Sequence, residues 1–155
     1  MILGLQLGIF LTFIILVWSQ HGVLPSISES WYTLKEKWMF TLFCYSLGFL
    51  HLFHEPGNIL YMLAGFSLIF VGAATRFKDG AYTTAIHIGG AISAIILSFI
   101  ALAIKGIWLG PIFTGLTWGW FKFFNIKNRT WWVEIVAFVF IMLSIFLTHT
   151  NFQQF

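Results

Sequence analysis

The sequence predicts an all-α fold, a polytopic bundle of six transmembrane helices that forms one domain over residues 1–155. Two observations lead to this prediction. Charged residues make up 8% of the chain and hydrophobic residues 59%, whereas an ordinary soluble domain has about a quarter charged residues. The uncharged residues also gather in long windows, and a spanning helix needs about 20 successive apolar residues. This composition excludes a soluble globular enzyme, a disordered chain and a disulfide scaffold.

Six apolar windows along the chain predict the helices. We expect them at about residues 2–19, 38–54, 58–75, 81–104, 107–124 and 131–150. The lipid core offers no hydrogen-bonding partner, so the backbone must pair within helices or closed barrels. A barrel is not expected, because windows such as residues 10–17 do not alternate apolar and polar side chains.

Turn residues and charges set the predicted boundaries. The first helix lacks a basic leader and a small-residue cleavage site, so we expect it to be retained. The segment 55–58 contains Pro, Gly and Asn, which favour a turn after the second helix. The charged segment 76–80 separates the third helix from the fourth, Lys105 and Gly106 end the fourth, and residues 125–130 precede the sixth.

The fifth helix is the least regular of the six. Gly110 and Pro111 interrupt its apolar window, which is charge-free only between Lys105 and Lys122. Lys122 could reach the membrane surface by extending its side chain. The alternative is five spanning helices plus a re-entrant segment, which moves the C-terminus to the other side of the membrane.

The distribution of basic residues predicts the orientation. Cytoplasmic loops of membrane proteins are enriched in Lys and Arg. With six spans, Lys105 alone lies on one side of the membrane. The other side receives Lys35, Lys37, Arg76, Lys78, Lys122, Lys127 and Arg129. We therefore expect the first, third and fifth loops in the cytoplasm and both termini outside.

Small residues predict where the helices pack most closely. The window 81–104 presents small residues around His87 at helical spacing, namely Gly90, Ala91, Ala94 and Ser98. The window 58–75 has Gly65 and Gly72 on one face. Small side chains let membrane helices approach closely, so these two helices are expected to form the tight core. A narrow pathway is the functional alternative.

One polar cluster is expected on the inner side of the membrane. It comprises Ser26, Ser28 and Glu29 of the first loop together with His87. An ionisable group within the membrane is a functional candidate. The alternative is that neutral His87 hydrogen-bonds a hydroxyl or carbonyl of the first loop, with Ser28 or Ser30 capping a short helix. Glu134 is expected at the interface beside a basic loop residue.

A second cluster is expected on the outer side. His51, His54 and Glu55 have the spacing of one helical face, and His149 could join them from the last helix. Imidazole and carboxylate groups are ligands that zinc prefers. These four residues are the candidate metal site, and headgroup-level His residues beside a solvated Glu55 are the alternative.

Three segments together resemble a known family. They are the run Pro25–Glu29 after the first helix, the run Phe70–Ala74 that ends the third, and His87 at the start of the fourth. Over about residues 18–100 this pattern is similar to the bacterial DUF998 proteins, which resemble the Frag1/DRAM/Sfk1 group of small membrane proteins. The resemblance implies a six-helix bundle and implies little about activity.

The sequence favours a non-enzymatic structural or accessory membrane component of unknown activity. It contains no phosphate-binding loop, zinc-protease helix or serine-nucleophile motif. Three alternatives stay open: a small proton or ion channel or transporter that uses His87, a zinc-dependent lipid hydrolase, and a viral membrane protein or holin. No cofactor is expected unless zinc binds.

The same composition predicts the location and the partners. A bacterial inner membrane or a viral membrane is the expected location. Membrane lipids are the expected partners, with other membrane proteins or further copies of the chain as additions. Nucleic acid is not expected, because the sequence has no basic cluster or recognition motif.

Overall fold

The computed structural model describes residues 2–55 and 57–151, and every regular element in them is helical. The six long helices are α1 Ile2–His21, α3 Trp38–Leu52, α4 Ile59–Ala73, α5 Ala81–Ile104, α6 Leu109–Phe123 and α7 Arg129–Asn151. Three short elements lie between them: η1 Ile27–Glu29, α2 Ser30–Thr33 and η2 Phe77–Asp79. The predicted all-α class is confirmed, and each long helix begins and ends within two residues of its predicted bounds.

Three of these helices are long and apolar enough to cross a membrane. They are Ile2–His21, Ala81–Ile104 and the Arg129–Thr148 part of α7. Helices α3 and α4 are apolar but have 15 residues each. At 1.5 Å per residue they measure about 22 Å, which is less than the hydrocarbon thickness of about 30 Å.

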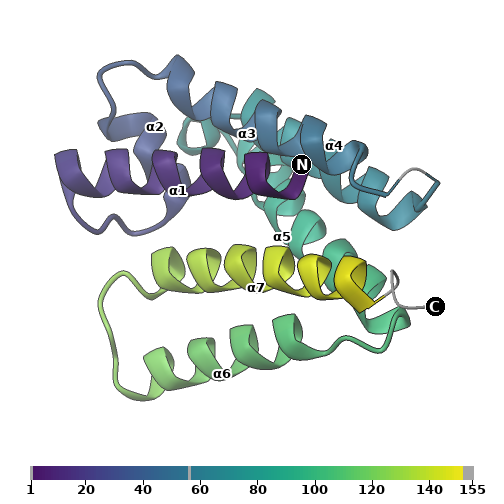
Figure 1. The fold of residues 1–155 in the computed structure, drawn as a ribbon. Helices are drawn as coiled ribbons and strands as arrows, with labels where there is room; N and C mark the ends of the chain where they lie inside the picture. The colour runs from purple at the N-terminus through teal and green to yellow at the C-terminus, as the bar shows by residue number, and fades with distance from the viewer. Residues whose placement is uncertain (1, 56, 152–155) are drawn as a thin grey trace.

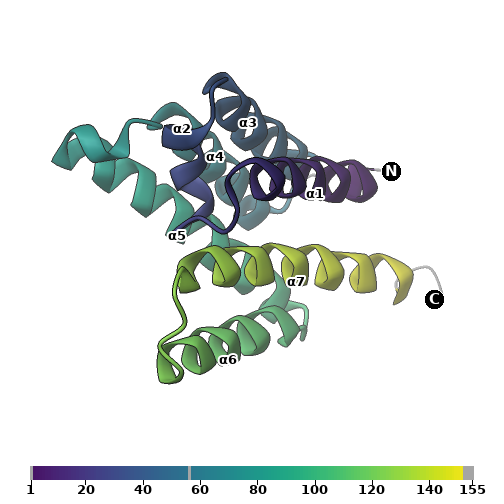
Figure 2. The ribbon, with the colours of Figure 1, turned by 90° about the vertical axis from the view of Figure 1, so that its left-hand side faces the viewer.

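The helices form two groups (Figure 1). Helices α3, α4 and α5 pack extensively on one another, while α6 and α7 form an antiparallel hairpin. Helix α1 lies against α3 and also contacts α7, and α7 contacts α5. After a 90° turn the hairpin still lies to one side of the other helices (Figure 2). The bundle is therefore joined across a seam formed by α1, α5 and α7.

Glycine allows α3 and α4 to approach closely. A Cβ atom added to Gly65 would lie 2.7 Å from the Gly48 carbonyl oxygen, and one added to Gly48 would lie 2.7 Å from the Gly65 oxygen. The predicted small-residue seam therefore exists, but Gly65 and Gly72 face α3. On α5, Gly90 meets the Ser67 carbonyl oxygen of α4. Helix α4 is thus packed on two sides.

The main apolar core lies where α1, α3 and α7 meet. Phe10 stacks on Phe138 with ring centroids 4.6 Å apart, and Phe13 stacks on Phe43 at 4.0 Å. The Phe40 ring centroid lies 6.2 Å from that of Phe13 and 6.4 Å from that of Phe43. Through these rings α1 packs against both α3 and α7.

Helix α6 is one continuous helix from Leu109 to Phe123. It runs alongside α7 as one unbroken helix (Figure 1). Gly110 is its buried residue, where an added Cβ would contact the Phe99 ring of α5 at 2.8 Å. The helix contains no internal reversal.

The connecting segments gather at two ends of the bundle. The first loop (residues 22–37) contacts residues of the third and fifth connections, through Glu29 to Lys78 and through Val23 to Asn128. Glu55 and Lys105 meet at the opposite helix ends. Alternate connections therefore lie at the same end of the bundle.

Candidate functional site

His87 is bonded through both nitrogens of its ring. Nδ1 lies 3.1 Å from the Val71 carbonyl oxygen and 3.0 Å from the Ala74 carbonyl oxygen. Nε2 lies 2.7 Å from the Ser28 hydroxyl. Val71 lies in the last turn of α4 and Ala74 follows its last residue, and carbonyls at this end of a helix lack intrahelical donors. His87 thus caps α4 while it contacts the first loop.

These contacts fix the protonation pattern of the imidazole. Carbonyl oxygens only accept, so Nδ1 must carry the hydrogen and donate. In the neutral ring Nε2 is then an acceptor, and the Ser28 hydroxyl donates to it. The His87 side chain is 2% exposed. This bonding is the arrangement expected for a neutral His87 that holds the first loop in place.

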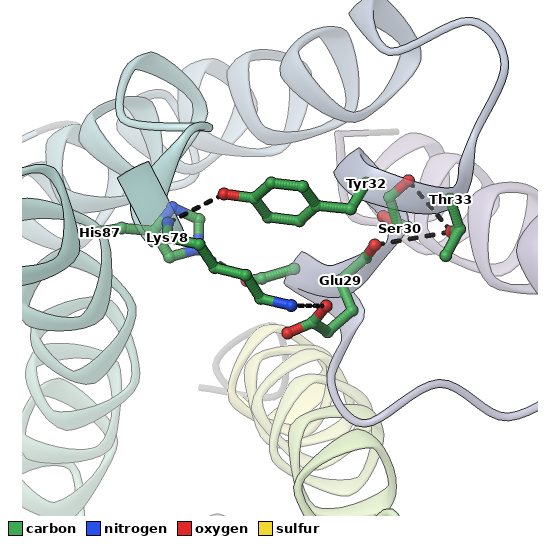
Figure 3. A network of polar contacts seen from close by, with 7 residues as sticks. Glu29, Ser30, Tyr32, Thr33, Lys78 and His87 are labelled. Carbon is green, nitrogen blue, oxygen red and sulfur yellow. Dashed lines mark hydrogen bonds and ion pairs between the residues drawn. The ribbon is translucent and has the colours of Figure 1, made fainter. Parts of the chain in front are cut away.

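Lys78 is the second attachment point of the first loop. Its Nζ donates to the Glu29 carboxylate at 2.5 Å, and its backbone N–H donates to the Tyr32 hydroxyl at 2.8 Å. Figure 3 shows Glu29 and Tyr32 extending from the loop toward Lys78, with His87 beside them. We call Ser28, Glu29, Tyr32, Lys78 and His87 the first-loop network.

The predicted capping serines have other roles. Ser26 precedes η1 but its side chain makes no capping bond, and Ser28 is used by His87. The Ser30 hydroxyl is buried and has no hydrogen-bond partner among the described residues. The capping prediction for Ser28 and Ser30 is therefore wrong. Ser28, Glu29 and His87 do come together, and Ser26 lies next to them in the chain.

Glu134 differs from its predicted environment. Its Oε2 accepts a hydrogen bond of 2.6 Å from the Ile27 backbone N–H, and neither ion pair of the described residues includes it. The sequence predicted a partner among the loop Lys and Arg residues. Instead the carboxyl group of α7 satisfies a backbone group at the start of η1.

A cavity of about 80 Å³ begins beside Glu134. Ser28 and Glu134 line one part of it, and His51 and Ser98 line another. His87 and Ser98, which bond Ser28 and His51, lie eleven residues apart on α5, or about 16 Å along the helix axis. The wall between these polar groups consists mainly of apolar side chains.

His51 has one bonded and one unbonded nitrogen. Ser98 donates its hydroxyl hydrogen to the Ala94 carbonyl at 2.8 Å, so it accepts from His51 Nε2 at 3.2 Å. His51 Nδ1 is then a lone-pair acceptor, and it has no hydrogen-bond partner among the described residues. Tyr61 stands edge-on to both His51 and His54.

Three members of the predicted metal-ligand set lie at the end of α3. The His51 and His54 rings stack with centroids 6.4 Å apart. Helix α3 ends at Leu52, so His54 and Glu55 lie in the connection that follows it. Glu55 binds Lys105 Nζ at 2.5 Å and the Asn58 amide at 3.2 Å. Burial alone would raise the pKa of Glu55, but the Lys105 hydrogen bond and charge, with Asn58, hold this pKa below its ordinary value of 4.5.

No three His, Cys, Asp or Glu side chains within residues 2–55 and 57–148 gather closely enough to hold a metal ion. The side chain of His149 lies outside the described part of the structure. Zinc binding by His51, His54, Glu55 and His149 therefore stays a prediction.

Several residues of the site carried little sequence signal. In the sequence Lys78 is one loop cation among several, and Ser98 is one small residue of a packing face. The distance between Ile27 and Glu134 is 107 residues, and no periodicity connects them. Glu134 is the one acidic residue in the last helical window, which was the available clue.

Comparisons with protein-family models, with curated proteins and with solved structures find no match to this chain. The resemblance to the DUF998 proteins therefore stays a prediction.

Proposed function

We propose that the chain is a six-span integral membrane protein with a structural or accessory, non-enzymatic role. The main support is the bonding of His87, whose two ring nitrogens hold the end of α4 and the first loop. A buried polar group with all its partners stabilises one arrangement of a bundle. In this proposal His87 joins the end of α4 to the first loop by hydrogen bonds and performs no reaction.

The arrangement of the connections supports six spans with both termini outside. The three connections that lie together carry, with the adjoining ends of α6 and α7, seven Lys and Arg, and Lys105 lies at the opposite end. This separation agrees with the enrichment of basic residues in cytoplasmic loops. In the proposed orientation α3, α4 and α6 cross a locally thinned or tilted region of the bilayer, as short helices do.

Cysteine labelling tests the span count. In a Cys44→Ala background, Trp108→Cys and Lys127→Cys place single thiols at the two ends of α6, where both residues are exposed. We expect a membrane-impermeant maleimide to label Trp108→Cys in spheroplasts and Lys127→Cys in inverted vesicles. Labelling of both from the same side would contradict six spans and support the re-entrant alternative.

Substitution of His87 by glutamine tests the structural role. A glutamine amide donates and accepts hydrogen bonds but does not titrate. We expect His87→Ala to lower thermal stability in detergent strongly and His87→Gln to restore much of the loss. If His87→Gln folds with normal stability but loses a measurable function of the protein in its membrane, the purely structural role is wrong.

A proton or ion transporter is the second candidate. The observation that favours it is the cavity, which places Ser28 and Glu134 and, further along, His51 and Ser98 on one internal surface. Flux into liposomes with a pH-sensitive dye is the measurement. A transporter predicts pH-dependent flux that disappears in His87→Ala while folding, checked by size-exclusion chromatography, is retained. Absence of flux in the unaltered protein would reject it.

A further inference from the structure

We propose that the internal cavity binds a protonated alkylamine, with the ammonium group at Glu134. This inference goes beyond the structural role, because it assigns a ligand class to the space between the first loop and helices α1, α3, α4, α5 and α7. It rests on a carboxylate with spare acceptor capacity, a wall of aromatic rings and a second acceptor further along the cavity.

The carboxylate supplies the charge. Within the described residues Glu134 accepts one hydrogen bond, from the Ile27 backbone, and a carboxylate has room for about four. A carboxyl group buried in an apolar bundle either takes up a proton or is paired with a positive charge. The two ion pairs of the described residues join Lys78 to Glu29 and Lys105 to Glu55, so neither neutralises Glu134. A cationic ligand would neutralise the Glu134 carboxylate.

Aromatic rings line the cavity beside this carboxylate. Phe10, Phe40, Phe43 and Phe138 are all part of the wall. Phe10 stacks on Phe138 at 4.6 Å, and it lies 6.2 Å from Phe43. The negative faces of such rings attract organic cations, most strongly where water is excluded. The same rings favour the alkyl part of an amine over an inorganic ion.

The shape and the far end of the cavity favour an unbranched ligand. Glu134 of α7 and His51 of α3 both line this cavity of about 80 Å³. His51 is 3% exposed, and its Nδ1 has no hydrogen-bond partner among the described residues. The alkyl chain of the amine lies against the apolar part of the lining, and His51 is a second acceptor in the same cavity.

Titration with n-hexylammonium tests the proposal, with 1-hexanol as the neutral probe of the same length. Met142 lines the cavity, so the protein labelled with ¹³C at the methionine methyl groups reports occupancy locally by NMR. The Met142 signal is assigned from a Met142→Leu variant. In nanodiscs of phosphatidylglycerol we expect n-hexylammonium to shift this signal at concentrations at least about tenfold lower than 1-hexanol, a difference typical of one charged contact.

Two variants separate the charge of Glu134 from other effects. Glu134→Gln keeps an acceptor for the Ile27 N–H, and we expect it to weaken n-hexylammonium binding about tenfold or more without changing 1-hexanol binding. Glu36→Gln is the matched control, because Glu36 is exposed and bonds Trp38. Should Glu134→Gln fail to fold, the comparison of the two probes in the unaltered protein still decides. Equal affinity for both probes, or no shift of Met142, overturns the proposal.

Lipid headgroups and free amines share the ammonium chemistry, and one further arm distinguishes them. Adding phosphatidylethanolamine to the nanodiscs supplies a lipid ammonium. Weaker n-hexylammonium binding then assigns the site to a lipid headgroup, and unchanged binding assigns it to free amines. A failed topology experiment would leave this ammonium site untouched, and a failed titration would leave the six-span proposal untouched.

Discussion

Ser28 donates a hydrogen bond of 2.7 Å to Nε2 of His87 across 59 residues of sequence. The bond joins the first loop to α5 and provides the only donor that the described structure offers to this nitrogen. The remaining nitrogen of the ring is bonded to the end of α4. Three separate segments therefore meet at one imidazole.

Removing the Ser28 hydroxyl should destabilise the protein. Ser28→Ala leaves a buried acceptor without a donor, which costs about 1 to 3 kcal/mol. Unfolding in mixed micelles of increasing denaturing-detergent fraction measures the change in free energy. Ser26→Ala is the matched control, because the Ser26 side chain makes no capping bond. Equal losses in both variants would contradict a specific role for Ser28.

Adjacent glycines on α5 should respond in opposite ways. A Cβ at Gly90 would lie 2.9 Å from the Ser67 backbone oxygen, whereas a Cβ at Gly89 meets nothing within 4 Å. We expect Gly90→Ala to cost about 1 to 3 kcal/mol by forcing α4 and α5 apart. Gly89→Ala should be neutral or stabilise by about 0.5 to 1 kcal/mol, because alanine favours the helix. Thermal unfolding in one detergent compares the pair, and a larger loss at Gly89 would be inconsistent with the observed packing.

Replacing Gln6 by methionine should stabilise the protein. Gln6 is fully buried, and neither polar atom of its amide has a hydrogen-bond partner among the described residues. An apolar side chain of similar shape removes a desolvation cost of about 1 to 3 kcal/mol. Gln6→Met should therefore raise the midpoint of thermal unfolding, while Gln20→Met, at an exposed position of the same helix, should change it little. Lower stability of Gln6→Met would indicate that the amide has a polar partner.

The Glu55–Lys105 ion pair should lose its contribution to stability in acid. The pKa of Glu55 is lowered below 4.5 in the folded protein, so its stabilising effect is fully present above about pH 4.5 and fades as the pH falls through the lowered value. Both side chains are partly exposed, and such pairs contribute about 0.2 to 1 kcal/mol.

The stability difference between the unaltered protein and Glu55→Gln measures this contribution. Unfolding in detergent between pH 3 and pH 7 should show a difference that is constant near neutrality and shrinks in the acidic range. Glu36→Gln, which removes an exposed carboxylate outside any ion pair of the described residues, should show no such trend. A difference that grows on acidification would contradict the sign of the pKa shift.

The sequence predicts the long helices because lipid imposes a simple requirement. A crossing segment must be apolar and of sufficient length, so the charges themselves mark the boundaries. The contact between His87 and the first loop was also foreseeable, since a buried imidazole on a small-residue face needs a polar partner. Both inferences use constraints that act locally or on one face of one helix.

The remaining features depend on tertiary structure that no local pattern encodes. His51 and His54 lie side by side, but α3 ends at Leu52 and Glu55 bonds Lys105 of another connection, which helical spacing does not predict. Glu134 accepts a hydrogen bond from Ile27 because α7 contacts η1, and this contact depends on how the other helices of the bundle pack. The cavity likewise results from how five long helices and one loop fit together.

The bond between Ile27 and Glu134 also bears on the order of events during synthesis. The Ile27 amide leaves the ribosome early, yet its acceptor is made 107 residues later. Helices α3, α4 and α5 are neighbours in sequence and in space, so they can associate while α7 is still missing. Until α7 is in place, the Ile27 backbone N–H lacks its Glu134 acceptor, and α1 lacks one of the helices against which it packs. Packing of the last helix is thus the step that completes the hydrogen bonds and contacts of α1 and η1.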